Sequence, residues 1–579
     1  MAPPAALAAA FPDGARPGPE ATIQLRRHVD GRLQGMRSYR YSWWTHWREL
    51  ADFILPRRYK WLITPNQFAR GSPINQHIID STGTIAARTL ASGIMSGVSS
   101  PTRPWFKLKI GRTDSTQTSP SSLWLADCER ILYLILKESN FYNAVAVAYF
   151  DLVVFGTAVI IIYENFENVI NCQNPCAGEY FLENSSTMEV NTLYREFVLT
   201  VGQCVEKFGV ENCSPTVQAL YRTASASLSR EVLIAHAIEP NDDFAGSRAG
   251  LPKHFPFREV YWEWGNAGDK VLRIRGFHEW PAACPRWDLV SNDPYGRSPG
   301  MDALPDIKQL QQETRRKAQA IDKMVNPPMI ADVALKNQPA SLLPGGVTYV
   351  PGFAQGRPGM APVYQVIPPV NEISADIKEV QERIKLIFFN NLFQMISQFE
   401  PKSNISATEI DARRSEQMVL IGPVLDRIDN ELLRPAIERV FSVAARAGIL
   451  PPAPPEIRGM PMEIEYVSML SEALASNRGG SIERLFSVVG NIAAIDPAAV
   501  DNVDFDFGLD KLAESWNIDP RVIRSPEALA EIRKARAQQQ QAAEQKQDML
   551  AATQGAKNLA QSPMGEGRNA LQTLAGGQT

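Results

Sequence analysis

Hydrophobic positions recur at helical spacing in two segments of similar length, on either side of a stretch rich in proline and glycine. The first, residues 299–325, predicts a helix that begins best at Pro305, where a missing N–H costs nothing, and runs about 30 Å to Met324. The second, residues 371–394, predicts a helix of about 35 Å with Asn371 as its N-cap. Its apolar stripe consists of Ile373, Ile377, Val380, Ile384 and Ile387. One isolated pair of helices cannot fully cover the part of this stripe from Ile373 to Ile384, so we predict that the chain oligomerises through the two helices and the segment between them.

The segment between these helices, residues 326–370, contains three β-type runs at 329–333, 347–350 and 363–367. A piece of this size cannot bury a core of its own, and copies of itself in a ring are its simplest neighbours. After the second helix, a polar loop at 395–405 leads to a capping box at 406–409. The box predicts a long helix over 406–450, kinked at Pro423 and Pro435.

The regions on both sides of this central part predict an α+β protein. Residues 1–20 are expected to be disordered, and 21–298 to form a mixed α/β region. Helices are predicted at 23–53, 78–98, 124–137 and 201–208, and strands at 159–163, 179–182, 259–264 and 271–277. The first of these helices carries three tryptophans, which we expect to dock it on the core.

The C-terminal region follows a proline-rich break at 451–455. Residues 451–524 predict short helices, such as 481–491 and 511–517, and a final helix begins at 525–527. That helix, within residues 525–579, is polar on all sides, which is typical either of one member of a multi-chain helical barrel or of disorder. We expect partial disorder beyond about Gln554.

An apolar run at 144–163 has two interpretations. It could be a membrane span, since only Asp151, Gly156 and Thr157 interrupt it. The alternative is a buried helix at 140–155, ended by Gly156 and followed by a β-branched strand at 159–163. The glycine and the change to β-branched residues favour the buried helix.

Composition narrows the function classes. The chain has 579 residues, 44% hydrophobic and 21% charged, which is ordinary for a large globular protein. Its 59 basic and 63 acidic residues leave a net charge of -4, the wrong sign for a protein that grips the phosphate backbone over a wide surface. Six cysteines lack zinc-site spacing, so we expect reduced thiols and no metal.

Candidate catalytic residues are few. A packaging ATPase needs a G-x-x-x-x-G-K-[ST] loop to hold phosphates, and the sequence has none. His77, Asp80 and Ser81 lie within about one helical turn, but no G-x-S-x-G elbow exposes the serine, so helix capping explains them better. The acidic cluster around Asp504 and Asp506 lacks the pattern of a calcium loop. We therefore expect neither catalysis nor a cofactor.

The order of helix, β-rich segment, helix, loop and kinked helix resembles the stem, clip, tunnel loop and wing helix of the portal (head-to-tail connector) proteins of tailed phages, particularly short-tailed ones. Short sequence segments are similar too: PGMDALPDI at 299–307, ATE at 407–409, GPVL at 422–425, NQHIIDSTGT at 75–84 and SPTRPWF at 100–106. The resemblance spans roughly residues 25–530, and these strings have no chemical mechanism of their own.

The resemblance implies a portal fold: wing at 21–298, stem helices at 299–325 and 371–394, clip at 326–370, tunnel loop at 395–405, kinked wing helix at 406–450 and crown at 451–524. It also implies a homo-oligomeric ring, twelvefold in the family, at one capsid vertex of the virion, assembled in the host cytoplasm. Duplex DNA would pass through it without sequence-specific binding during packaging and ejection. Implied partners are capsid and scaffolding proteins, the terminase large subunit and a tail adaptor.

Three sets of residues follow as candidates for this conduit. The channel loop offers Gln398, Phe399, Glu400, Lys402 and Asn404. Stem side chains that could face the channel are Lys308, Arg315, Arg316 and Lys323, and those that could pack the stem are Ile373, Ile377, Val380 and Ile384. The alternatives are a membrane-associated pore protein, which rests on 144–163 alone, and a DNA-packaging enzyme.

Overall fold

The computed structural model describes residues 19–58, 75–110, 120–223, 225–241, 255–265, 270–325, 329–331, 360–362, 369–391, 421–457, 462–466, 484–492, 503–515, 526–561, 563–564 and 568–569. The chain forms two compact units. The first holds residues 1–106, 130–450 and 466–471, and the second holds the remainder. Helices and antiparallel sheets occur together, which agrees with the predicted α+β class.

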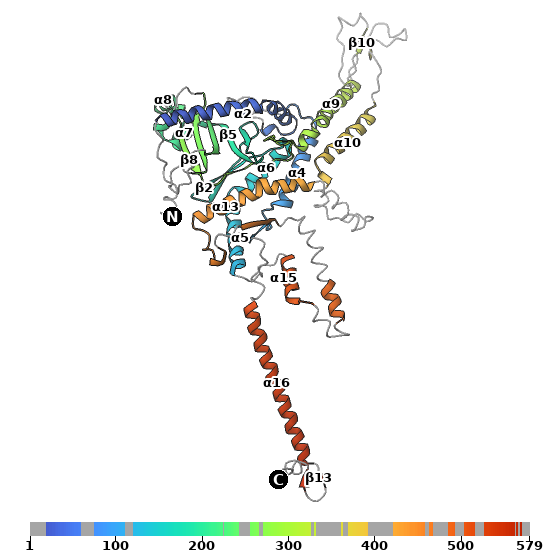
Figure 1. Cartoon of the computed structure of the whole chain (residues 1–579). Helices are drawn as coiled ribbons and strands as arrows, with labels where there is room; N and C mark the ends of the chain where they lie inside the picture. The colour runs from blue at the N-terminus through green and yellow to red at the C-terminus, as the bar shows by residue number, and fades with distance from the viewer. Residues whose placement is uncertain are drawn as a thin grey trace. The chain divides into compact units, whose positions relative to one another are not determined.

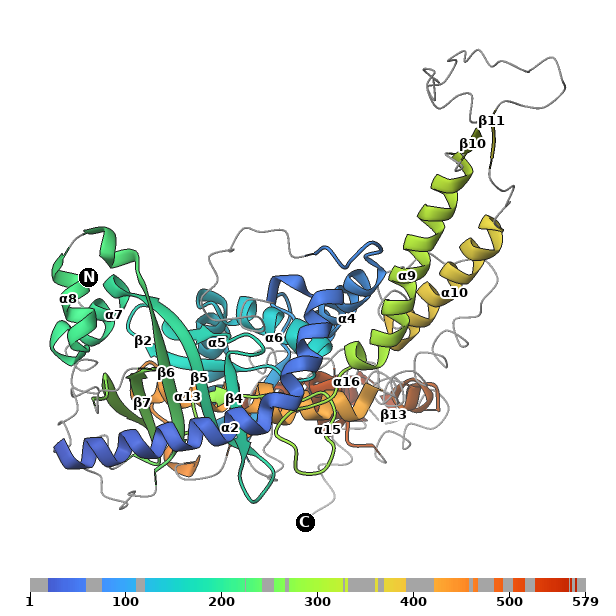
Figure 2. The same cartoon turned by 90° about the horizontal axis from the view of Figure 1, so that it is seen from above.

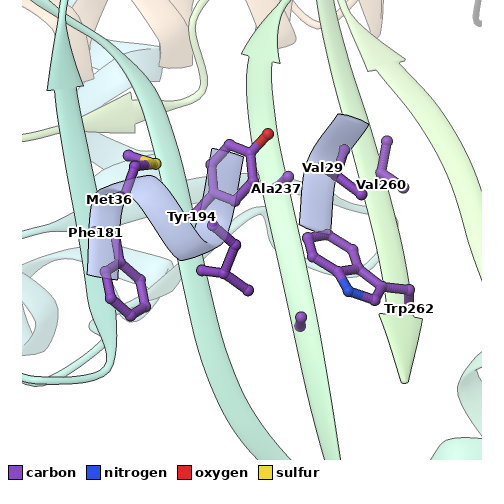
Figure 3. Close-up of a cluster of buried hydrophobic side chains, with 9 residues drawn as sticks. Val29, Met36, Phe181, Tyr194, Ala237, Val260 and Trp262 are labelled. Carbon is purple, nitrogen blue, oxygen red and sulfur yellow. The ribbon is translucent and has the colours of Figure 1, made fainter. Parts of the chain in front are cut away.

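The first unit is built around a five-stranded antiparallel sheet in the order β4-β5-β6-β7-β8. Its strands are β4 (Tyr180–Asn184), β5 (Val190–Thr200), β6 (Glu231–Pro240), β7 (Phe257–Glu263) and β8 (Arg273–Phe277). Helix α2 (Pro19–Phe53) lies across one face of the sheet (Figure 1). Val29, Leu33 and Met36 recur on one side of α2 and are buried against the sheet, beside Tyr194 and Trp262 (Figure 3).

The opposite face of the sheet is covered in part by α7 (Val201–Phe208) and α8 (Pro215–Thr223). The predicted helix at 201–208 is confirmed. A capping box explains its start, because Gln203 N donates to Thr200 Oγ1 at 3.2 Å and Thr200 N donates to Gln203 Oε1 at 3.0 Å. The short helices η2 (Val210–Asn212) and η3 (Ser225–Ser229) flank α8. A second sheet contains β2 (Ile160–Asn165), β3 (Val169–Gln173) and β9 (Ala282–Ala283), in the order β3-β2-β9.

The apolar run at 144–163 is a buried helix followed by a strand, as its glycine and β-branched residues predict. Helix α6 (Phe141–Phe155) ends at Gly156, which has φ 77° and donates its N–H to Leu152 O at 3.0 Å. Strand β2 begins four residues later. Within the described ranges, no helix has both the length and the apolar character needed to cross a membrane.

The first unit also contains several further helices and one pair of short strands. They are η1 (Pro56–Arg58), α4 (Thr82–Val98), α9 (Pro299–Val325), β10 (Met329–Ala331), β11 (Met360–Pro362), α10 (Val370–Ile387), the π-helix η7 (Asp429–Leu433) and α13 (Arg434–Arg446). Helices α9 and α10 lie side by side in both views (Figures 1 and 2). We call this pair the stem.

The second unit contains β1 (Phe106–Ile110) paired with β12 (Met462–Tyr466), and α5 (Pro120–Glu138) begins in it. Its other elements are η8 (Pro455–Ile457), α15 (Phe505–Ser515), α16 (Pro526–Gln561), β13 (Pro563–Met564) and β14 (Arg568–Asn569). Helix α16 starts where predicted but continues to Gln561, past the expected onset of disorder at Gln554. Asp504 accepts a hydrogen bond from Phe507 N at 3.0 Å, so this carboxylate caps α15.

Candidate channel-forming stem

The first stem helix begins earlier than predicted. Helix α9 starts at Pro299, and Pro305 lies inside it. Ser298 is its cap, because Met301 N donates to Ser298 Oγ at 3.1 Å. Pro299 at the first helical position needs no N–H partner, which makes it a better start than Pro305. The prediction of Pro305 was wrong because two prolines fitted the same rule and only the earlier one follows a capping serine.

The base of the stem is attached to the C-terminal end of α6. Ser298 Oγ donates to Val154 O at 2.7 Å, Trp47 Nε1 donates to Phe155 O at 3.2 Å, and Trp287 N donates to Gly156 O at 2.9 Å. These carbonyls have no partner within a helix that ends here, so groups from other elements supply the donors. The buried helix α6 therefore fixes both the start of α9 and the tryptophan-rich end of α2.

A second attachment joins the stem to the segment before α4. Gln311 of α9, which is 6% exposed, accepts hydrogen bonds from Ile79 N and Asp80 N at 2.7 and 2.8 Å and donates to Asp80 O at 2.8 Å. Gln381 of α10 donates to Asp80 Oδ2 at 2.8 Å, and the other carboxylate oxygen accepts from Thr82 N at 2.8 Å. Asp80 therefore satisfies the first N–H of α4 from the position before the N-cap, while the N-cap Ser81 makes no side-chain capping bond. Asp80 also joins both stem helices to the start of α4.

Three of the four residues predicted to pack the stem are in its interior. Ile377, Val380 and Ile384 are 7%, 1% and 0% exposed, and Ile373 is half-buried. Helix α10 contacts α4 as well as α9, so a third helix covers the stripe. We expected two helices alone to leave the stripe partly open, and for these three residues that expectation was wrong. The sequence pattern does not reveal that α4 is a neighbour of α10.

The four basic candidates for the channel differ in their surroundings. Lys308 Nζ lies 2.8 Å from Glu49 Oε2 and 5.7 Å from the centre of the Phe53 ring, so Lys308 joins α9 to α2. Arg315, Arg316 and Lys323 are exposed and make no ion pair with any other residue that the structure describes. These three are therefore available to a ligand or a partner, whereas Lys308 is already engaged.

The distal part of the stem exposes apolar side chains. On α9, Ile321 is 42% exposed, Met324 49% and Val325 71%. Leu386, near the base of the stem where α10 ends, is 63% exposed. Helix α10 ends at Ile387 with Phe388 as its C-cap, short of the predicted Gln394. Its N-cap position is Pro369, so Asn371 already lies inside the helix and the predicted cap was wrong.

The small β-rich segment at the tip of the stem contains one described strand pair. Strands β10 and β11 are antiparallel, with Ile330 opposite Ala361. Residues 329–331 of the run predicted at 329–333 thus form a strand, whereas the runs at 347–350 and 363–367 lie outside the described residues. The channel-loop residues Gln398, Phe399, Glu400, Lys402 and Asn404 also lie outside them.

The predicted long helix has an irregular turn near its predicted kink. Residues 421–428 are helical, η7 is a π-helical turn, and α13 follows with Pro435 in its first turn. Arg286 holds this turn through Glu431, with Nη2 to Oε1 at 2.6 Å. Burial raises the pKa of Asp429 in the same turn to about 7, and the neighbouring Asp426 carboxylate adds to this shift.

Sequence reasoning did not identify Gln311, Trp47 or Ser298 as residues that position the stem. Gln311 bonds to partners 231 and 232 positions away, Trp47 to one 108 away and Ser298 to one 144 away. Only Ser298 carries a local signal, as a serine directly before a proline. For the other two, the sequence contains no pattern that names the partner.

Comparison with known proteins places the chain in a family. The family described as bacteriophage head to tail connecting protein matches residues 26–523. The "Probable portal protein" of Bordetella phage BPP-1 is 40% identical over 520 residues, which cover 90% of this chain and 92% of the relative. The "Portal protein" of Salmonella phage epsilon15 is 38% identical over 531 residues, 92% of this chain and 94% of the relative.

Among solved structures, a chain of the virion of a native gene transfer agent particle matches with a TM-score of 0.27 and 11% identity, over 70% of this chain and 94% of that one. A score this low carries no argument about the fold. The sequence matches do, because they run along nearly the whole chain and include the stem at 299–387. The chain therefore belongs to the bacteriophage head to tail connecting protein family.

Proposed function

We propose that this chain is a portal protein: it assembles as a ring at one capsid vertex and forms the conduit through which duplex DNA is packaged and later ejected. The observation that carries the proposal is the near full-length match to two proteins named as portal proteins, at 40% and 38% identity. The role is structural, and we expect no nucleotide hydrolysis by the purified chain, since its sequence has no phosphate-binding loop.

The stem supplies the channel wall in this proposal. Its exposed surface mixes Arg315, Arg316 and Lys323 on α9 with Glu372 and Glu379 on α10. A wall of mixed charge binds a polyanion weakly, because its basic side chains neutralise few phosphates, and so release few counterions, at one time. Such a wall suits DNA that must slide along the channel, whereas a strongly basic wall would retain it.

The segment at the tip of the stem is proposed to dock the terminase large subunit during packaging and a tail adaptor afterwards. The subunit number is proposed to be twelve, and capsid and scaffolding proteins are the partners at the vertex. The loop at 395–405 is proposed to reach the narrowest part of the channel. There Lys402 of each subunit would meet passing phosphates, with Glu400 two residues away limiting how tightly it holds them.

Negative-stain imaging of the purified full-length chain tests the ring. We expect closed rings with a central opening. A chain that stays monomeric at every concentration, and also in the presence of its capsid and scaffolding proteins, would overturn the proposal.

Deletion of residues 398–403 tests the channel loop separately. Rings and empty heads should form as in the wild type, while filled heads should retain less DNA, measured as genome length per particle. Lys402→Gln is the matched control, which keeps the loop and removes only its basic charge. Unchanged DNA retention after the deletion would leave the loop as a connector.

A further inference from the structure

Two of the six cysteines lie in contact. All six are buried free thiols. Cys204 on α7 and Cys213 after η2 are both 0% exposed, and their Sγ atoms are 3.8 Å apart. They sit in the apolar cluster that α7 and α8 form on the sheet, next to Phe208 and Val217.

The turn between the two cysteines holds their sulfur atoms together. Gly209 ends α7 with φ 82°, a conformation that L side chains rarely adopt. Cys213 Sγ donates to Gly209 O at 3.2 Å, and Asn212 Nδ2 donates to Phe208 O at 2.7 Å. The second thiol is thus fixed against the end of the helix that carries the first.

The contact also changes the chemistry of the pair. The hydrogen bond between the two sulfurs raises the pKa of Cys204, to which burial adds, and lowers the pKa of Cys213. A lower pKa increases the thiolate fraction, and the thiolate is the form that reacts with oxidants. Cys213 is therefore the better nucleophile of the two.

Sequence spacing alone would favour a different pair, because Cys172 and Cys176 are separated by only three residues. In the structure, Cys176 Sγ donates to Glu179 Oε2 at 3.7 Å instead. Burial and, after it, the Glu179 carboxylate raise the pKa of Cys176 well above its usual value, and burial raises the pKa of Cys172 to about 12. These two thiols are therefore poor nucleophiles with no sulfur partner in contact.

We propose that Cys204 and Cys213 form an intramolecular disulfide when the protein moves from a reducing to an oxidising environment. The Cys213 thiolate attacks a peroxide, breaks its O–O bond and becomes a sulfenic acid. The Cys204 sulfur then displaces water from this group and forms the S–S bond. Overall, two thiols lose two hydrogens and hydrogen peroxide is reduced to two waters.

Such a bond would join the middle of α7 to the segment just before α8, over the sheet face that carries Ile234 and Tyr261. It closes a short loop and so restricts the unfolded chain. The change of environment follows from the proposed function, since a phage particle leaves the reducing cytoplasm after assembly. The chemistry itself needs only the geometry of the pair, so its test does not depend on ring formation.

In the test, the reduced full-length chain is treated with stoichiometric hydrogen peroxide. It is then unfolded in a denaturant that contains iodoacetamide, which alkylates the free thiols, and the cysteines are mapped by peptide mass. We expect a peptide pair joined between Cys204 and Cys213, lighter by two hydrogens, and a thermal midpoint higher by roughly 2–5 °C. The variant Cys204→Ala should lose both effects, whereas Cys172→Ala should keep both. If Cys204 and Cys213 are both alkylated after oxidation, or if Cys172 and Cys176 are joined instead, the proposal is wrong.

Discussion

Two residues of α10 can distinguish the interior of the stem from its free surface. Ile384 is 0% exposed and Leu386, two positions later, is 63% exposed. Ile384→Ala removes three buried carbon groups, which cost about 2.4 kcal/mol at about 0.8 kcal/mol each. The cavity that remains raises the total to about 3–4 kcal/mol. Leu386→Ala removes as many atoms from a mostly hydrated position, so we expect less than about 1 kcal/mol.

Hydrogen exchange of the α10 amides, followed by mass spectrometry, measures this difference where it occurs. A loss of about 3 kcal/mol makes local opening roughly 100-fold more frequent, so Ile384→Ala should speed exchange by about that factor. Leu386→Ala should change it by no more than a few-fold. Equal effects of the two variants, or wild-type exchange in Ile384→Ala, would refute the assignment of this face to the interior.

The same burial changes what acidic substitutions in the stripe should do. Because Ile377 and Ile384 are interior within one chain, Asp at both positions buries carboxylates without partners and should unfold the stem locally. It should not release intact subunits from a ring. A folded monomer with wild-type exchange in α10 would contradict this expectation.

Two further predictions concern pH and glycine. Burial raises the pKa of Asp429 to about 7 from an unfolded value of 3.8, so its contribution, on the order of 4 kcal/mol, is complete below pH about 4 and is lost as the pH rises through about 7. Asp429→Asn should remove this decline in thermal midpoint between about pH 4 and pH 7, and an unchanged pH profile would contradict the shift. Gly156→Ala should destabilise by at least about 1–2 kcal/mol, because its φ is +77° and a Cβ would stand 2.2 Å from Gly296 O. Gly97→Ala, whose new Cβ would meet no atom within 4 Å, should instead stabilise the protein by about 0.5 kcal/mol and raise its thermal midpoint slightly. If both glycine variants shift the midpoint in the same direction, the space around the Cβ and the φ angle do not decide the effect at these positions.

Two helices whose ends carry a glycine signal, α6 and α7, were predicted well. Helix α6 ends at Gly156 because only a glycine adopts its φ of 77° without strain, and this residue also separated a buried helix from a membrane span in the sequence. Helix α7 matches its predicted bounds because the signals at both ends, Thr200 and Gly209, are next to it in the sequence. Boundaries of this kind depend on residues within one turn, which a single sequence displays.

The two longest strands of the main sheet, β5 and β6, were not predicted. Both faces of this part of the sheet are covered, so apolar and polar residues do not alternate along the strands. Instead, polar residues in them pair inside the protein: Arg195 Nε donates to His236 Nδ1 at 2.9 Å, and His236 Nε2 donates to Glu259 Oε1 at 2.9 Å. Burial lowers the pKa of His236 to about 4, so the ring is neutral and can link the two charged groups. Without its neighbours, such a strand looks too polar to be buried.

The stem shows why an apolar stripe does not by itself indicate a subunit interface. The stripe on α10 has helical spacing and could face another chain or another part of its own chain. Here Ile377 and Ile384 are buried within one subunit, where α10 contacts α4 as well as α9. Contacts about 300 positions apart help to fix this arrangement, such as Gln381 with Asp80. In the described part of the stem, the large apolar residues that remain exposed lie elsewhere, at Ile321, Met324 and Val325 of α9 and at Leu386 of α10. If rings form through the stem, these exposed side chains are the apolar candidates for its contacts among the described residues, because Ile377, Val380 and Ile384 of the stripe are already buried within the subunit.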